Sequence, residues 1–237
     1  MIKVICPPSE ENPFAIIDKP SLLPSAPLSD TDKQNAFFEA ASIFPELLSV
    51  KGKKPCEYGL LHRLDTATRG LLVIAATDSA YERLLESQKN GLFEKTYCAI
   101  VEKNPERPQS FPPFPDALKQ KLEEGKECAV ESYFRAFGEK GKAVRPVTAD
   151  AGKAALKKSG SHLYTTHIKL CDSGERAICK IVAGYRHQVR CHLSWAGFPV
   201  KGDELYNTRF SGGALYFSAV AVRFPHPLTN EIVEYSL

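Results

Sequence analysis

The sequence predicts an α+β fold with a mixed, largely antiparallel central sheet flanked by helices and loops. Segments with strand-like patterns outnumber segments with helical periodicity. Several neighbouring strand segments are separated by short turn-rich stretches, so they can pair as antiparallel hairpins. Apolar residues make up 43% and charged residues 25% of the chain, which is typical of a globular protein with a packed core.

In the first part of the chain, "FAIIDKP" at 14–20 predicts a short apolar strand that Pro20 ends, and the first dozen residues read as a loosely structured start. "SLLPSAPLSD" reads as an extended loop. Asp30 or Thr31 is then predicted to cap a helix that ends near Pro45. The apolar positions of this helix include Ala36, Phe37, Ala40 and Phe44.

Three further elements are expected before residue 102. "LLVIAA" at 71–76 predicts a buried strand. Ser79 and Glu82 have the spacing of a capping box, which predicts a helix that stops at Gly91. "FEKTYCAIV" at 93–101 alternates as a strand, so Lys95 and Tyr97 share one face.

The second part of the chain begins with a surface linker, because residues 105–115 contain five prolines. Strands are predicted at 128–137, 163–170 and 178–183, and in "ALYFSAVAVRF" and "EIVEYSL", which "PHPLTN" joins as a hairpin. "RHQVRCHLSWAG" predicts a helix that Gly197 ends. Arg186 and Arg190 are four residues apart and would project from one face of it. Val189, Leu193 and Ala196 would face the core.

Composition excludes several classes of protein. The length of 237 residues fits one large domain or two small ones. The seven cysteines include no C-x-x-C pair, so neither a disulfide framework nor a zinc ribbon is indicated. With no recognisable signal peptide, this favours a cytoplasmic protein. No apolar run reaches the about 18 residues that a membrane span needs.

The net charge of +3 is only mildly basic, but basic residues are concentrated between residues 138 and 159. That stretch holds six basic residues against two acidic ones: Lys140, Lys142, Arg145, Lys153, Lys157 and Lys158 against Glu139 and Asp150. The simplest interpretation is a solvated loop. The alternative is an arm that contacts phosphate groups.

Motifs for common cofactors are missing from the sequence. It contains no G-x-x-x-x-G-K-[ST], no G-x-G-x-x-G and no G-x-S-x-G. His187 and His192 are five apart on the predicted helix, which is a poor spacing for one face, so we interpret them as structural and expect no metal site.

Three stretches contain the candidates for chemistry: "LLHRLDTATRG" around Asp65, "EKTYCAI" around Tyr97, and "AGYRHQVRCHLSWAG" around Arg190. Each has an ordinary structural interpretation when taken alone. The acid can be a turn cap, the tyrosine can pack in the core, and the arginine can be a solvated helix residue.

Taken together, the three stretches resemble the RluA-like RNA pseudouridine synthases. "HRLDTATRGLLVIA" resembles that family's H-R-L-D-x-x-T-S-G-L-L-L-x-A signature. "FAIIDKPSLLP", "FEKTYCAIV", "GYRHQVRCHLSWAGFPVKGDELYN" and "FPHPLTNEIVEYSL" resemble its other motifs, in the same order. Arg69 departs from the pattern, which usually has serine there. Tyr185 and Arg186 replace the usual Arg-Thr before His187.

The resemblance implies an enzyme that isomerises uridine in RNA to pseudouridine, without cofactor or metal, on a base flipped out of its stack. The catalytic residues it implies are Asp65, Tyr97 and Arg190, with Arg190 paired to Asp65. Tyr97 would stack on the flipped base, and Arg63 would fill the space that the base leaves. The substrate-binding residues it implies are Arg63, Lys95, His62 and Thr68.

The expected partner is structured RNA, ribosomal or transfer, and the expected protein is a cytoplasmic monomer with no membrane contact. Residues 1–237 would form a single catalytic domain without a separate N-terminal RNA-binding domain. Two other functions stay open. One is a non-catalytic RNA-binding protein that retains the synthase fold. The other is a hydrolase using Asp65 with a histidine, although no nucleophile motif supports it.

Overall fold

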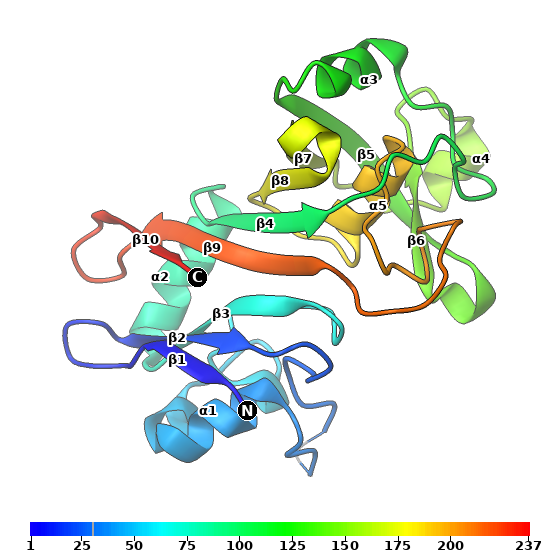
Figure 1. The fold of residues 1–237 in the computed structure, drawn as a ribbon. Helices are drawn as coiled ribbons and strands as arrows, with labels where there is room; N and C mark the ends of the chain where they lie inside the picture. Colours follow the sequence, from blue (N-terminus) through cyan, green and yellow to red (C-terminus); the bar gives the residue numbers. More distant parts are fainter. Residues whose placement is uncertain (30) are drawn as a thin grey trace. The chain divides into compact units, whose positions relative to one another are not determined.

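The computed structural model describes residues 1–29 and 31–237, which form two compact units (Figure 1). The first unit comprises residues 1–95 and 218–237, and the second comprises residues 96–217. Each contains a largely antiparallel sheet with helices, so the predicted α+β class is confirmed. In the described part of the chain, no helix is long and apolar enough to cross a membrane.

The sheet of the first unit has the order β1-β2-β3-β9, and β10 pairs with β9. Its strands are β1 (Lys3–Cys6), β2 (Phe14–Lys19), β3 (Arg69–Ala75), β9 (Phe217–Pro225) and β10 (Ile232–Ser236). The contact between β3 and β9 is parallel, and the other pairs are antiparallel. The predicted strands at 14–20 and 71–76 and the C-terminal hairpin are therefore confirmed.

Strand β1 corrects the expectation of a loosely structured start. Lys3 and Val4 pair with Asp18 and Ile17 of β2, so backbone hydrogen bonds hold this segment. Both β2 and most of β3 are buried on both faces, which is why they read as continuous apolar runs rather than alternating ones. Helix α2 (Asp78–Lys89) packs Ala80, Tyr81 and Leu84 against buried apolar residues of the sheet.

The caps of both helices in the first unit differ from the prediction. Helix α1 (Ala36–Ile43) is capped by Asn35, whose Oδ1 accepts from the backbone N–H of Phe38 at 3.0 Å. Thr31 lies outside the helix, and Asp30 lies outside the described residues. Helix α2 is capped by Thr77 rather than Ser79. An N-cap residue directly precedes the first helical turn. Thr31 lies too far before α1 to cap it, and Ser79 lies inside α2.

The sheet of the second unit has the order β4-β8-β7-β5-β6. Its strands are β4 (Glu94–Ile100), β5 (Cys128–Phe137), β6 (Ala143–Val147), β7 (Tyr164–Cys171) and β8 (Arg176–Ile181). Four of them confirm the predicted strands at 93–101, 128–137, 163–170 and 178–183. The linker at 105–115 has no helix or strand, and helix α3 (Asp116–Glu123), which we did not predict, follows it.

Helix α5 (Gln188–Trp195) is buried on every side. His192 fixes it to two strands: its Nε2 lies 2.9 Å from Ser132 Oγ in β5 and its Nδ1 lies 2.8 Å from Thr166 Oγ1 in β7. The predicted start was wrong, because His187 has a left-handed backbone (φ 58°) that keeps the preceding residue out of the helix. Arg186 is therefore exposed, while Arg190 is buried.

The basic stretch 138–159 is not the simple solvated loop of the prediction. It contains a 3-10 turn (Glu139–Gly141), strand β6 and helix α4 (Lys153–Lys157). Ala143, Val144 and Val147 of β6 are buried, which explains why this segment pairs with β5. The five lysines of the stretch remain exposed: Lys140, Lys142, Lys153, Lys157 and Lys158.

Candidate active site

The loop that contains Asp65 is held in place by side chains from the segment after β2. Ser25 Oγ accepts from the backbone N–H of Leu64 at 2.9 Å and also lies 2.8 Å from the Leu64 carbonyl. Ser21 Oγ donates to the Ala67 carbonyl at 2.6 Å. A turn hydrogen bond of 2.9 Å joins the N–H of Thr68 to the carbonyl of Asp65. The backbone around the acid is thus fixed on both sides.

Lys19 is fully buried beside this loop. Its Nζ donates to three backbone carbonyls: Pro20 at 2.9 Å, Leu23 at 2.7 Å and Thr66 at 3.2 Å. Burial lowers the pKa of Lys19 to about 8, while the charges of Asp65 and Asp18 act in the opposite direction. Lys19 therefore ties the end of β2 to the loop and places a cation near Asp65.

Arg69, which departs from the family pattern, forms an ion pair with Asp18. Its Nη2 lies 2.7 Å from Asp18 Oδ2, and its Nε also donates to this carboxylate. The Asp18 side chain is only 7% exposed, whereas that of Arg69 is 57% exposed. The hydrogen bonds and charge of Asp18 raise the pKa of Arg69. Arg69, in place of the usual serine, therefore supplies the partner that the buried Asp18 carboxylate needs.

Gly70 is required where the loop enters β3. Its backbone has φ 131°, and a Cβ atom there would lie 2.2 Å from the carbonyl oxygen of Ala219 in β9. A side chain would force the two strands apart. The glycine of "TRG" therefore allows β3 and β9 to approach each other directly after the loop.

His62 and Lys95 are two polar residues of the first unit that both lie near the Phe93 ring. Both ring nitrogens of His62 are buried without a hydrogen-bond partner in the described part of the chain, and its ring packs edge-on against Phe93 at 5.7 Å. Lys95 Nζ lies 5.9 Å from the centre of the Phe93 ring. Burial lowers the pKa of Lys95 to about 8. Burial, with the nearby Lys95 charge, lowers the pKa of His62 to about 3.

Thr68 also has a buried polar atom without a partner: its Oγ1 forms no hydrogen bond among the residues described. Unpaired buried polar atoms are uncommon in folded proteins. Of the four residues predicted to bind substrate, Thr68 and His62 thus have buried side-chain atoms whose hydrogen-bonding capacity the described residues leave unused. Another of the four, Arg63, has a side chain that is 57% exposed and lies 3.4 Å from Glu57.

Tyr97 shares one face of β4 with Lys95, as the alternation predicted, and the structure shows that this face is buried. Lys95, Tyr97 and Ala99 are buried, while the residues between them are partly exposed. The Tyr97 ring stacks on Phe217, with ring centres 5.1 Å apart and an interplanar angle of 6°. This packing fixes the plane of the tyrosine ring.

Arg190 forms a buried bidentate pair with Asp203. Its Nε and Nη2 each donate to one carboxylate oxygen at 2.7 Å, and the two side chains are 6% and 0% exposed. Asp203 Oδ1 also accepts from the backbone N–H groups of Leu205 and Tyr206. The predicted partner, Asp65, belongs to the other unit, so the pairing of Arg190 with Asp65 stays a prediction.

Tyr185 and Arg186, the second departure, both have structural contacts. The Tyr185 ring stacks on Phe134 at 5.1 Å. Arg186 Nη2 donates to the carbonyls of Gly141 and Ala143 at 2.5 and 3.3 Å. This guanidinium therefore holds the end of the β5–β6 hairpin.

The histidines of "RHQVRCH" have structural contacts, as predicted. Both ring nitrogens of His192 are hydrogen-bonded, and His187 Nδ1 lies 3.1 Å from the Tyr206 hydroxyl. Among the residues that the structure describes, no three His, Cys, Asp or Glu side chains cluster so that they could hold a metal ion.

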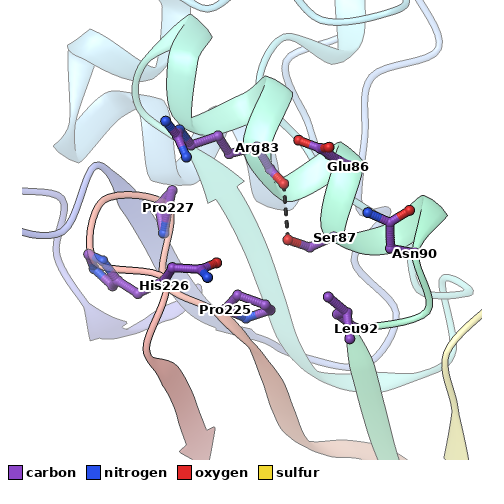
Figure 2. A pocket seen from close by; sticks show the side chains of 9 residues that line it. Arg83, Glu86, Ser87, Asn90, Leu92, Pro225, His226 and Pro227 are labelled. Carbon is purple, nitrogen blue, oxygen red and sulfur yellow. Dashed lines mark hydrogen bonds between the residues drawn. The ribbon is translucent and has the colours of Figure 1, made fainter.

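A surface hollow lies elsewhere in the first unit, between α2 and the turn that joins β9 to β10 (Figure 2). Arg83 and Ser87 line it from the helix, Asn90 lines it from the position directly after the helix, and His226 lines it from the turn. His226 Nδ1 lies 3.3 Å from the backbone nitrogen of Leu228, so this ring stabilises its own turn. None of the predicted site residues lines this hollow.

Comparison with known proteins decides the family. The sequence model described as "RNA pseudouridylate synthase" matches residues 13–195. The chain belongs to this RNA pseudouridylate synthase family. An uncharacterised RNA pseudouridine synthase of Bacillus subtilis is 29% identical over 181 residues, which cover 75% of this chain and 50% of the relative. The ribosomal large subunit pseudouridine synthase C of Escherichia coli is 27% identical over 186 residues, covering 73% and 50%.

The resemblance to RluA-like synthases is thereby confirmed. The chain spans about half the length of these two relatives. Among solved structures, human RNA pseudouridylate synthase domain containing 1 superposes with a TM-score of 0.65 at 17% identity. The match covers 100% of this chain and 83% of that one, and it supports the synthase fold.

Two residues outside the predicted site hold predicted site residues in place. Lys19 holds the loop of Asp65, and Asp203 holds Arg190. Lys19 lies in "DKP" and Asp203 lies in "GDELYN", two stretches that resemble motifs of the family. These motifs were the only sequence feature that could have pointed to the two residues.

Proposed function

We propose that this chain is an RNA pseudouridine synthase that acts on specific uridines in ribosomal or transfer RNA. The observation that carries the proposal is the loop of Asp65. Its backbone is fixed by Ser25 and Ser21, and a buried cation, Lys19, lies beside it. A carboxylate in a rigid loop near a fixed positive charge suits a reaction that needs a positioned, ionised acid.

The reaction is an isomerisation, so its atoms balance without any added reagent. The bond from the sugar C1′ to N1 of the base breaks, and a bond from C1′ to C5 forms. The proton leaves C5, and N1 gains a proton. We assign the essential carboxylate to Asp65. Tyr97, whose ring plane is fixed by Phe217, would stack on the turned base and assist proton removal. Arg190 would keep the acid ionised.

Four residues would bind the RNA. Arg63 is exposed, so it can move to fill the space of the flipped uridine. His62 and Thr68 have buried donors or acceptors that the described chain does not satisfy, and Lys95 is a buried cation. Polar groups of the nucleotide would satisfy them, which is the usual means by which a site recognises one base over another.

The remaining parts of the proposal concern the whole protein. We propose that residues 1–237 act as one catalytic domain, as a monomer in the cytoplasm, without metal or cofactor. The free cysteines agree with a reducing compartment, because none of the seven forms a disulfide.

Sequencing of pseudouridine in total RNA, from cells with and without this protein, tests the activity and identifies the site. The proposal expects one or a few uridines in ribosomal or transfer RNA to lose the modification when the protein is absent. An unchanged pseudouridine map would favour the alternative of a non-catalytic RNA-binding protein.

A further inference from the structure

Two arginines face each other across strands β5 and β6. Arg135 in β5 is the antiparallel partner of Arg145 in β6, so both side chains leave the same face of the sheet. Residues in this relationship have Cβ atoms about 4.5–5.5 Å apart, and like charges there destabilise the strand pair. The arrangement therefore costs stability unless a negative group lies between the two side chains.

No acidic side chain of the described residues forms an ion pair with either arginine. Arg145 Nη1 donates to the Ser110 carbonyl at 2.9 Å, which holds the guanidinium in place. Its Nε is buried without an acceptor among the described residues. Burial, with the charge of Arg135, lowers the pKa of Arg145. The side chain is thus positioned, and part of its donor capacity is unused.

The surroundings of the pair are also positive. Lys140 and Lys142 are exposed in the turn of the same hairpin, and between residues 135 and 145 only Glu139 is acidic. Strand β6 is the edge strand of its sheet and contains Pro146, which cannot donate a ladder hydrogen bond. The Arg135–Arg145 pair therefore lies on a basic hairpin at the sheet edge, where a long polyanion can approach.

We propose that Arg135 and Arg145 together bind one phosphate group of the RNA backbone. Guanidinium groups bind phosphate through paired, charge-assisted hydrogen bonds, and a phosphate between them would remove their mutual repulsion. The inference rests on the proposed function, since it names a contact between that enzyme and its RNA. It also predicts that the pair lowers stability in the protein without RNA, because the repulsion is then uncompensated.

Binding of bulk transfer RNA, measured over a series of salt concentrations, tests the site. The variants are Arg135→Gln, Arg145→Gln and the double variant. Arg176→Gln is the matched control, because Arg176 is an exposed arginine of the same unit that has an acidic partner, Asp172, at 3.0 Å. The slope of log affinity against log salt should fall by about one in each single variant. The double variant should lose no more than a single one, because one shared phosphate is lost.

Thermal unfolding without RNA separates this site from a structural role. Arg135→Gln should raise the midpoint, because it removes the repulsion while the Arg145–Ser110 contact stays. A lower midpoint combined with an unchanged salt slope would overturn the proposal. An equal loss of slope in the Arg176→Gln control would also overturn it. Pseudouridine mapping is independent of both readouts: if no pseudouridine depends on the protein but the slopes fall as expected, the phosphate site stands and the proposed activity fails.

Discussion

Arg190 and Asp203 form a bidentate ion pair that is buried on both sides, with two N–O distances of 2.7 Å. The pair joins helix α5 to the "GDELYN" segment that follows it. Two backbone N–H groups of that segment also bind the Asp203 carboxylate, so its charge is well satisfied. This pair fixes the position of the arginine that we propose acts with Asp65.

Asp203→Asn should destabilise the protein by about 3–5 kcal/mol, because a buried guanidinium loses its counter-charge. The measurement is the free energy of unfolding in urea. Asp172→Asn is the control, since Asp172 belongs to an exposed pair with Arg176, and its cost should stay below about 1 kcal/mol. Equal costs for the two variants would show that burial of the Arg190–Asp203 pair is not important for stability.

Arg69→Ser should destabilise the protein on the order of 1–3 kcal/mol, because it leaves the Asp18 carboxylate buried without its partner. Serine is the residue of the family pattern at this position. The double variant Asp18→Asn/Arg69→Ser should recover much of the loss, since the buried charge is removed as well. Urea unfolding of the two single variants and the double variant gives the coupling energy. Simple additivity of the two single effects would contradict the ion-pair explanation.

His62→Phe should make the protein less sensitive to acid. The pKa of His62 is lowered from about 6.5 to about 3, so the unfolded chain binds one more proton than the folded chain between these values. Stability from this group is complete above pH 6.5 and falls as the pH drops towards 3. Phenylalanine cannot titrate. As the pH drops through this window, the free energy of unfolding should therefore fall less steeply in the variant than in the wild type, by about 1.4 kcal/mol per pH unit.

The measurement for this prediction is the free energy of unfolding between pH 7 and pH 4. His62 forms no hydrogen bond in the described part of the chain, so the variant should be as stable as the wild type at pH 7. His192 has the same lowered pKa but two hydrogen-bond partners, and it is unchanged in the variant. An identical pH dependence in wild type and variant would show that folding does not lower the pKa of His62.

Replacement of Lys153, Lys157 and Lys158 by alanine should weaken RNA binding and flatten its salt dependence, if helix α4 contacts phosphates. The three lysines are exposed, so stability should change little. The control removes three other exposed lysines of the same unit: Lys103, Lys121 and Lys126. A salt slope equal to that of the wild type would return these lysines to the role of a solvated surface.

The strands of both units could largely be predicted from sequence, because their patterns are local. β2 and β3 are continuous apolar runs, and β4 and β5 alternate. β1 was missed because four residues are too few to show a pattern, and its pairing with β2 decides its structure. β6 was missed because basic residues and a proline conceal its buried apolar positions.

The candidate site could be predicted only through its motifs. Nothing in the spacing of Arg190 and Asp203 shows that they pair, because the chain must leave the helix and turn back before the two side chains meet. Likewise, lysine on an apolar strand is most often a surface residue. The burial of Lys19 follows from three carbonyl partners, of which one lies 47 residues away in the sequence.

The most direct test of the proposed function is pseudouridine formation by purified protein and its Asp65→Asn variant, on total RNA from cells that lack the protein. Asparagine keeps the shape of the side chain and removes its charge. We predict that the wild type modifies its uridine and that the variant forms no pseudouridine there, although it unfolds at a similar temperature and binds the RNA. Near-normal pseudouridine formation by the folded variant would contradict the assignment of Asp65 as the catalytic carboxylate.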